Sequence, residues 1–440
     1  MIRSILTQLW NCRKANFSVL LELLLVFGLV WYITDFLFVY AFNLGIPNHR
    51  DMRHTWQVNI DLLQPDHPEY RAEENEPQAL YDNYHRILRI LQDYPGVEAV
   101  GMASNRAAPG SGNYRGRHVY STDDTTRHVD VQEMDIYPGT DYFRVFRHTR
   151  DNGAGPVSVN DFDWTGVQRP VVVSRSVAEA LFPGENAVGK QMVANPSATD
   201  MAVTIAGVVD DTKRFDYLRP RHVVYSAIQQ MDSWGIQMWR FYAVTAIRSD
   251  ASLPDSRFAE DFSEAMTGDL RAGNFFFNEL VPYEKMAADT SDRFGVTSTL
   301  NIRVYLMAFF LLNILLCITG TFWYRVNVRR SEIGLRKAMG ATNASVRSMF
   351  ILEGLCLLSL AAPVAMCIEL QFVGAGLIDT FGKNWGADTD KVYLIDRAAL
   401  RFAITNGITW AILAAVILAA ISIPARRAVA LPSSEALRTN

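Results

Sequence analysis

RRSEIGLRKAMGATNASVRSMF, residues 329–350, decides the organisation of the chain, because it is a basic segment between two apolar runs of membrane length. Upstream, residues 304–324 contain no charged side chain, and downstream residues 349–372 form the next run. A helix needs ~20 apolar residues to cross a bilayer. From Arg325 to Arg347 the chain has five arginines and one lysine against one acid. Short loops with an excess of Lys and Arg stay in the cytoplasm, so we expect this segment to face the cytoplasm.

Inside this segment the sequence predicts a short surface helix joined by a tight elbow to a spanning helix. Ser331 can cap the short helix, and Gly340 suits the left-handed residue that ends it. Thr342 then offers an oxygen to cap the next helix. The apolar residues of the short helix cluster roughly on one side: Ile333, Ala338 and Met339. A helix held in this way can transmit a push, whereas the alternative is an ordinary basic loop that only fixes topology.

Three stretches resemble the MacB/FtsX family of ABC-transporter permeases. EIGLRKAMGAT, residues 332–342, is similar to the segment by which this family docks on a separate ATPase subunit. IPARRAVALPSSEALRT, residues 423–439, resembles the C-terminal tail of the family, and residues 171–214 resemble its periplasmic domain. The resemblance as a whole extends over most of the chain, with the three stretches in the expected order.

The resemblance implies a site for coupling to the ATPase within residues 332–342. The residues expected to make polar docking contacts are Glu332, Arg336 and Lys337. Those expected to fill a groove of the ATPase are Ile333, Leu335 and Met339. The remaining positions of the expected site are Gly334, Gly340 at the elbow, Ala341 and Thr342.

The resemblance also implies a mechanism and partners. Two permease chains, as a homodimer or a heterodimer, would flank two cytoplasmic ABC ATPases, and ATP-driven closure would be relayed outward as mechanotransmission. The expected activity is efflux or export of peptides, antimicrobials or lipoproteins, with a periplasmic adaptor or hydrolase as a further partner. One alternative is an FtsX-like regulator that activates a cell-wall hydrolase or a signalling partner. A second alternative is a membrane-anchored sensor or adhesion protein without an ATPase partner.

Composition and hydropathy predict a membrane α-helical protein with four transmembrane helices and a large inserted α+β extracytoplasmic domain. The 440 residues are 49% hydrophobic and 20% charged with a net charge of −4, which fits neither a disordered chain nor a nucleic-acid-binding protein. The expected segments are an interfacial amphipathic helix at 1–16, span one at 17–42, a MacB-like periplasmic domain at 43–299, and an FtsX-like permease domain at 300–440 with spans at 304–324, 349–372 and 400–423.

Charge counting predicts the topology. Basic residues precede span one, fill the loop between spans two and three, and follow span four, whereas the loop between spans three and four contains four acids and three bases. This distribution places both termini in the cytoplasm and the large domain in the periplasm of a bacterial inner-membrane protein. Four acids lie inside the spans but away from the midplane: Glu22, Asp35, Glu353 and Glu369. We therefore interpret them as interfacial or inter-helix partners and not as an ion relay, with Pro363 as a kink.

The large domain is predicted to open with a strand-helix-strand unit that resembles a porter subdomain, followed by an inserted lobe. The predicted strands are 55–62, 97–102, 171–173 and 203–209, and the predicted helices begin at Pro77, at Ser176 and at Glu284. The last of these is expected to continue as a stalk into span two. Residues 107–122 and 149–166 are expected to be loops or the boundary of the inserted lobe.

No residue pattern points to a catalytic, metal or cofactor site. Residues 184–190 spell G-x-x-x-x-G-K, but Gln191 stands where a phosphate loop needs Ser or Thr, and a helix and a turn precede the motif. The histidines lack H-E-x-x-H spacing, and all four cysteines lie in or beside the spans, so the large domain contains no disulfide. We expect a non-catalytic permease subunit whose ATP hydrolysis takes place on a partner chain.

Overall fold

The computed structural model describes residues 13–430 except 114, 151–152, 229–242 and 378–390. The chain forms two compact units, one built from residues 13–42, 297–377 and 392–430 and the other from residues 43–296. We call the first the membrane unit and the second the outer unit. Most of the amphipathic helix expected at 1–16 lies outside the described residues. The predicted fold class, four membrane-length helices with an inserted α/β domain, is confirmed.

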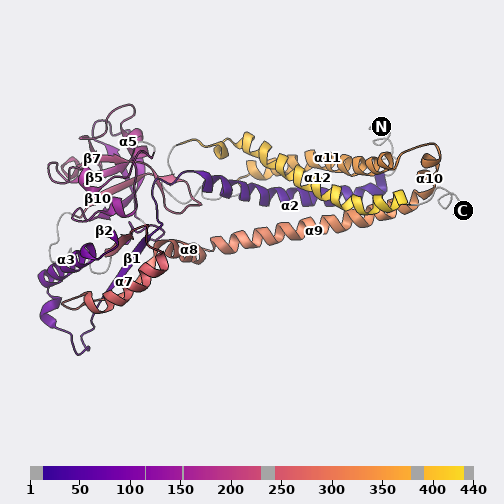
Figure 1. The fold of residues 1–440 in the computed structure, drawn as a ribbon. Coiled ribbons are helices and arrows are strands. Elements are labelled where there is room, and N and C mark those ends of the chain that lie inside the picture. The colour runs from indigo at the N-terminus through magenta and orange to yellow at the C-terminus, as the bar shows by residue number, and fades with distance from the viewer. Residues whose placement is uncertain (1–12, 114, 151–152, 229–242, 378–390, 431–440) are drawn as a thin grey trace. The chain divides into compact units, whose positions relative to one another are not determined.

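Four helices of the membrane unit are long and apolar enough to cross a bilayer. They are α2 (Arg13–Gly45), α9 (Val296–Val328), α11 (Asn343–Gly374) and α12 (Ala398–Ala430). Short α10 (Arg330–Ala338) joins α9 to α11, and a 3₁₀ turn at Leu394–Asp396 precedes α12 (Figure 1). α11 continues through Pro363, so span three is one helix.

The core of the membrane unit is made by large apolar side chains from all four long helices. Phe27 of α2, Phe322 of α9, Phe350 of α11 and Ile417 of α12 are all fully buried in one cluster. Gly354 allows α11 to approach α12 closely, because a Cβ atom there would lie 2.4 Å from the Cδ1 of Ile421. The burial of apolar area in this cluster holds the four helices together.

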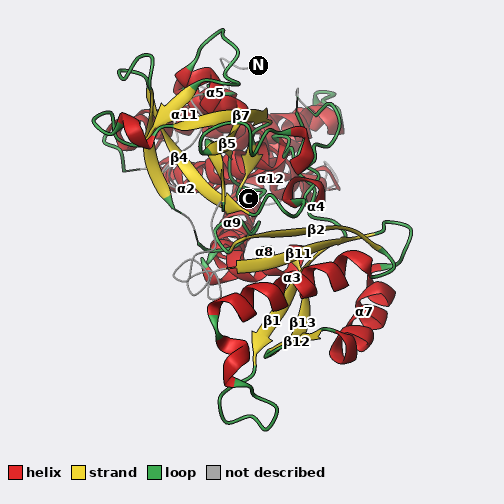
Figure 2. Cartoon of the chain, turned by 90° about the vertical axis from the view of Figure 1, so that its left-hand side faces the viewer, coloured by secondary structure: helices red, strands yellow, loops and turns green. Residues whose placement is uncertain are grey.

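The outer unit begins and ends with a β-α-β-β-α-β lobe. Its elements are β1 (Thr55–Leu62), α3 (Pro77–Asp93), β2 (Val97–Ser104), β11 (Ala243–Ser249), α7 (Asp255–Asp269) and β13 (Phe275–Pro282), with β12 (Arg271–Ala272) beside β13. The sheet order β2-β11-β1-β13 is antiparallel throughout, the arrangement of a split β-α-β fold. Helices α3 and α7 cover one face of this sheet (Figure 2), where Ile87 and Phe262 are fully buried.

The second lobe is inserted between β2 and β11 and is a closed barrel. Its strands are β3 (Gly116–Ser121), β4 (His128–Ile136), β5 (Pro170–Ser174), β6 (Gln191–Val193), β7 (Val203–Val209) and β10 (Val223–Ala227). They pair in the order β4-β3-β6-β7-β5-β10, and β10 pairs again with β4 to close the ring. The hairpin strands β8 (Thr212–Lys213) and β9 (Pro220–Arg221) stand apart from this ring. Helix α5 (Arg175–Leu181) packs Val177 and Leu181 into the barrel core.

Two local expectations need correction. Residues 107–122 do mark the boundary of the inserted lobe, but they are not a loop throughout, because strand β3 occupies Gly116–Ser121 and pairs with β4 and β6. The helix expected from Glu284 does not continue into span two. Helix α8 (Tyr283–Arg293) ends before Gly295, which has a φ of 70°, and α9 begins at Val296. A left-handed residue cannot lie inside a right-handed helix, so the helix is interrupted at this glycine.

Candidate functional site

Helix α10 is the candidate coupling site. Its nine residues, RSEIGLRKA, carry Glu332 in the first turn and Arg336 and Lys337 in the last turn, the charge distribution that the helix dipole favours. Glu332 and Arg336 also form an i,i+4 ion pair at 2.7 Å between Oε1 and Nη2. Arg336 Nη1 lies 2.9 Å from Met349 Sδ, so this side chain also contacts α11. The helix is short, and these contacts fix it locally.

The C-terminal end of α10 is locked by backbone hydrogen bonds. The amide of Gly340 donates to the carbonyl of Lys337, and the amide of Ala341 donates to the carbonyl of Arg336, both at 3.0 Å. This pair of bonds is the Schellman motif, which requires a left-handed residue after the helix. Gly340 supplies it with a φ of 90°, so the predicted left-handed elbow is confirmed.

The N-cap of α11 is Thr342, two residues after Gly340. Thr342 has an extended conformation, and its side chain accepts a hydrogen bond from the amide of Ser345 at 3.2 Å. The predicted N-cap is therefore confirmed. Only Ala341 separates the left-handed residue of one helix from the cap of the next, so the connection between α10 and α11 contains little slack.

The N-terminal end of α10 differs from the prediction. The N-cap is Arg329, with no side-chain capping bond, and Ser331 lies inside the helix. The reason is that α9 extends to Val328 and the chain turns within a single residue, so the helix begins before the serine is reached.

The two sides of α10 have different environments. Ile333 is 2% exposed in the membrane-unit core, and Gly334 is buried beside it. Leu335 is 53% exposed and Met339 is 73% exposed. Ile333 therefore packs inward and is not available for a groove of another protein, and the expected apolar side shared by Ile333 and Met339 is wrong. The outward apolar residues are Leu335 and Met339, which are flanked by the half-buried Arg336 and Lys337.

A buried ion-pair node lies at the start of α10. Glu353 of α11, with a side chain 3% exposed, accepts hydrogen bonds from Arg325 Nη1 and, at 2.9 Å, from Arg329 Nη1. Arg325 Nη2 also donates to Asn16 Oδ1 of α2. One carboxylate thus connects the end of α9, the N-cap of α10 and the body of α11. The sequence predicts Glu353 to be an interfacial or inter-helix partner but does not identify its arginines, because nothing in the spacing distinguishes them from the basic residues nearby.

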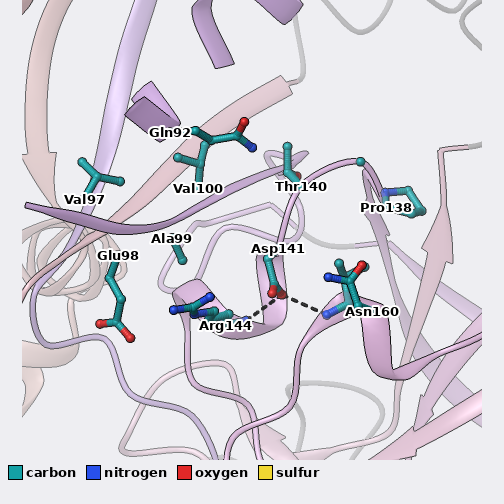
Figure 3. Close-up of a pocket in the computed structure, with 12 residues that line it drawn as sticks. Gln92, Val97, Glu98, Ala99, Val100, Pro138, Thr140, Asp141, Arg144 and Asn160 are labelled. Atoms are coloured by element: carbon teal, nitrogen blue, oxygen red, sulfur yellow. Dashed lines mark hydrogen bonds between the residues drawn. The ribbon is translucent and has the colours of Figure 1, made fainter. Parts of the chain in front are cut away.

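The outer unit contains a polar pocket of about 350 Å³ beside β2, α4 (Tyr142–Val145) and the 3₁₀ turn at Val159–Asp161. Asp141 lies at its wall and accepts a hydrogen bond from the amide of Arg144 (Figure 3). It also accepts hydrogen bonds from the amide of Val159 and from Ser158 Oγ. This carboxylate is therefore occupied in holding the loop together. The pocket offers no free acid or base from Asp141.

Ser176, Asp211 and His222 also meet in the outer unit. Ser176 Oγ donates to Asp211 Oδ1 at 2.6 Å, and His222 Nδ1 lies 2.9 Å from the same hydroxyl. In a catalytic triad the acid orients the histidine. Here the carboxylate of Asp211 instead accepts hydrogen bonds from the hydroxyl and from the amide of Ser176. Asp211 therefore fixes the first turn of α5. Among the described residues, no group of three or more His, Cys, Asp or Glu could hold a metal ion.

Residues 184–190, which resemble a phosphate-binding motif in sequence, form a turn. Gly184 and Gly189 have φ values of 75° and 87°, and the segment leads from α5 into β6. A phosphate loop leads from a strand into a helix, so the geometry excludes that interpretation.

One buried histidine of the outer unit has an unusual environment. His148 is fully buried against the rings of Tyr142, Phe143 and Tyr225, and neither ring nitrogen has a hydrogen-bond partner in the part of the chain that the structure describes. Burial, assisted by the positive charge of Arg50, lowers the pKa of His148 to about 3. His148 is therefore neutral at pH 7.

Fold and site define a class of multi-pass membrane protein in which a two-lobed unit is inserted between the first and second of four spans. Family models agree with this class: the MacB-like periplasmic core domain matches residues 18–256, and the FtsX-like permease C-terminal domain matches residues 304–439. The chain belongs to the MacB/FtsX family of ABC-transporter permeases. It is thus a permease subunit of an ABC transporter and a multi-pass bacterial membrane protein, and the family implies an ABC ATPase as its partner.

Part of this chain is similar to several solved structures. The periplasmic region of MacB from Actinobacillus actinomycetemcomitans is 13% identical with a TM-score of 0.30, covering 54% of this chain and 93% of that one. The extracellular domain of the noncanonic ABC-type transporter YknZ from Gram-positive bacteria is 14% identical with a TM-score of 0.26, covering 51% and 100%. A domain of a putative permease protein from Porphyromonas gingivalis is 15% identical with a TM-score of 0.32, covering 54% and 93%. No curated protein matches the chain.

Proposed function

We propose that this permease subunit receives force from a separate cytoplasmic ABC ATPase through α10 and uses it to move the outer unit. The observation that carries the proposal is an exposed apolar pair, Leu335 and Met339, on a short helix that is fixed at both ends. Exposed apolar side chains next to charged ones are typical of a protein contact.

In this proposal the residues of the expected coupling site have three different parts. Leu335 and Met339 fill a groove of the ATPase, and the polar contacts come from Glu332, Arg336 and Lys337. Ile333 and Gly334 pack inward and hold the helix against the spans. Gly340, Ala341 and Thr342 form the stiff elbow that passes movement of α10 to α11.

The Glu353 node is a second route for force, because it ties the N-cap of α10 to α9 and α11 through Arg329 and Arg325. A displacement of α10 would pull on three helices at once. Packed cores change between discrete arrangements and do not deform continuously, so a small shift at α10 can be passed on through the membrane unit.

We propose the topology that charge counting predicts, with both termini and α10 in the cytoplasm and the outer unit in the periplasm of the inner membrane. Two permease chains and two ATPases would form the working complex. For the exported compounds we propose the class that the resemblance implies, peptides, antimicrobials or lipoproteins, with a periplasmic adaptor or hydrolase as a further partner.

Crosslinking in a variant without native cysteines tests the proposal. Leu335→Cys and Met339→Cys, expressed in the native membrane, should crosslink to a nucleotide-hydrolysing subunit that mass spectrometry identifies. Asn327→Cys, also exposed but on α9, is the matched control and should crosslink weakly or not at all. Labelling of Leu335→Cys by an impermeant thiol reagent from outside the cell would overturn the proposed topology. Purification of the complex without any ATPase would overturn the coupling.

A further inference from the structure

Four acidic residues lie inside the membrane-length helices, and Glu369 differs from the other three. Glu22 accepts a hydrogen bond from Cys317 Sγ at 2.6 Å, Asp35 is paired with Arg401, and Glu353 is paired with two arginines. Glu369 is 3% exposed, and neither of its carboxyl oxygens has a hydrogen-bond partner in the described part of the chain. An ionised carboxylate buried in this way is strongly disfavoured.

The spacing of residues along α11 places Glu369 on the inward side of this helix. It continues a buried stripe at helical spacing that includes Leu358, Ala362 and Ala365. Its carboxyl group lies against α2 at Gly28, where a Cβ atom would be 4.0 Å from Glu369 Oε1. The missing side chain of Gly28 leaves room for the carboxyl group between the helices.

The neighbouring cations already have other partners. From α12, Arg401 donates Nε to Asp35 Oδ1 at 2.8 Å and Nη2 to Asp35 Oδ2, so the pair on α2 and α12 is neutral. From α9, the guanidinium of Arg303 lies 3.9 Å from the centre of the Phe36 ring. No cation among the described residues is therefore within ion-pair distance of Glu369.

The polar neighbour of Glu369 on α12 is an amide. Asn406 lies beside the carboxyl group and is 3% exposed. Its Nδ2 donates to the carbonyl of Phe402 at 3.1 Å. A neutral amide at this place offsets only part of the cost of burying an ionised carboxylate.

We propose that Glu369 is a proton-binding site of the membrane unit and carries a proton as a neutral carboxylic acid at neutral pH. The proton comes from water and returns to water, and its loss leaves one uncompensated negative charge among α2, α11 and α12. Release of the proton therefore requires these helices to loosen enough to admit water. The proposal is independent of the identity of the ATPase.

Infrared difference spectroscopy of the full chain in lipid nanodiscs tests it. At pH 7 the wild-type protein should show the carbonyl band of a protonated carboxylic acid, which shifts when the glutamate carboxyl groups are labelled with ¹³C. Glu369→Gln should remove this band, and Glu332→Gln, which changes the solvent-exposed acid of α10, should leave it in place. The absence of a ¹³C-sensitive acid band from the wild-type spectrum at pH 7 would overturn the proposal. This outcome can be measured even if the Glu369→Gln protein does not fold.

Thermal stability gives an independent measurement. An acid that is neutral when buried and ionised when unfolded stabilises the protein at low pH, and the stabilisation is lost as pH rises. The melting temperature of the wild-type chain should therefore fall more steeply between pH 5 and pH 8 than that of Glu369→Gln. Parallel curves for the two proteins would contradict a bound proton.

Discussion

Helix α11 carries two inward glutamates, and the membrane unit satisfies them in opposite ways. Glu353, near the start of the helix, is held by Arg325 and Arg329, whereas Glu369, near its end, has no ionic partner in the described residues. Burial is nearly the same, at 2% and 3% exposed. The difference lies in the supply of cations. Two arginines of the α9–α10 junction converge on Glu353, but Arg401 is already committed to Asp35. The same residue type on one helix therefore serves as an ionic anchor at one end and, in our proposal, as a neutral acid at the other.

The largest effect that this comparison predicts is that of Glu353→Gln. Removal of one partner of a buried ion pair leaves the other charge uncompensated, so we expect the free energy of unfolding to fall by about 3–5 kcal/mol. Denaturant titration in detergent measures it. Glu332→Gln, which breaks the partly exposed pair with Arg336, is the control and should cost about 1 kcal/mol or less. A Glu353→Gln protein as stable as the control would mean that the node does not anchor the helices.

His148 extends the comparison to the outer unit, because it is also a buried group that avoids charge. Its pKa of about 3 lies below its unfolded value of 6.5. The unfolded chain therefore binds a proton that the folded chain rejects, and stability is lost as pH falls from 6.5 toward 3. Relative to His148→Phe, wild-type unfolding free energy should fall by about 1.4 kcal/mol per pH unit, or about 2 kcal/mol at pH 5. Denaturant titrations of the full chain at pH 7.5 and pH 5 measure the difference. Identical pH dependence in both proteins would mean that His148 is charged in the folded state.

Gly340→Val tests the elbow between α10 and α11 without changing an ion pair. No atom lies within 4 Å of a Cβ at this position, so the substitution acts through the backbone alone. A left-handed conformation costs a β-branched residue about 1–2 kcal/mol, and we expect the elbow to distort. Reconstituted complexes should hydrolyse ATP without moving the outer unit, as monitored by a pair of spin labels. Gly340→Asn, which tolerates the left-handed region, is the matched control. Wild-type movement in the valine variant would refute a stiff elbow.

Asp35→Asn should have the smallest effect on stability. It frees Arg401, which we expect to pair with Glu369 instead because Asp35 and Glu369 lie near each other, so the unfolding free energy should fall by only about 1 kcal/mol. In this variant Glu369 should lose its proton, and the acid band in the infrared spectrum should disappear at pH 7. The double variant Asp35→Asn with Glu369→Gln removes both partners of Arg401 and should be far less stable than either single variant. Additive effects would show that the two acids do not compete for Arg401.

Sequence patterns were sufficient for the parts of the molecule that depend on local rules. Apolar runs predict the four long helices, and the Gly340 and Thr342 positions predict the elbow because each satisfies backbone groups within a few residues. The strand at Thr55–Leu62 and the helix from Pro77 follow from periodicity. These features need no knowledge of tertiary contacts.

Features that depend on distant parts of the chain were not predictable in this way. Strand β3 has a weak alternation of its own and forms because β4 and β6 flank it, and β10 closes the barrel onto β4 across about ninety residues. Ile333 faces inward because Phe350 and the other spans supply a core on that side. The arginines that pair with Glu353 and the absence of a cation beside Glu369 are likewise set by helix packing.

Closure of the barrel has a consequence for recognition. Each of its six strands has a neighbour on both sides, although the short β6 pairs with only two residues of β3 and two of β7, so a partner that meets the barrel is recognised mainly by side chains and loops. In the other lobe, β12 covers only Phe275 and Phe276 of β13. Beyond these two residues, β13 is an edge of the outer unit that is open to strand addition by a partner.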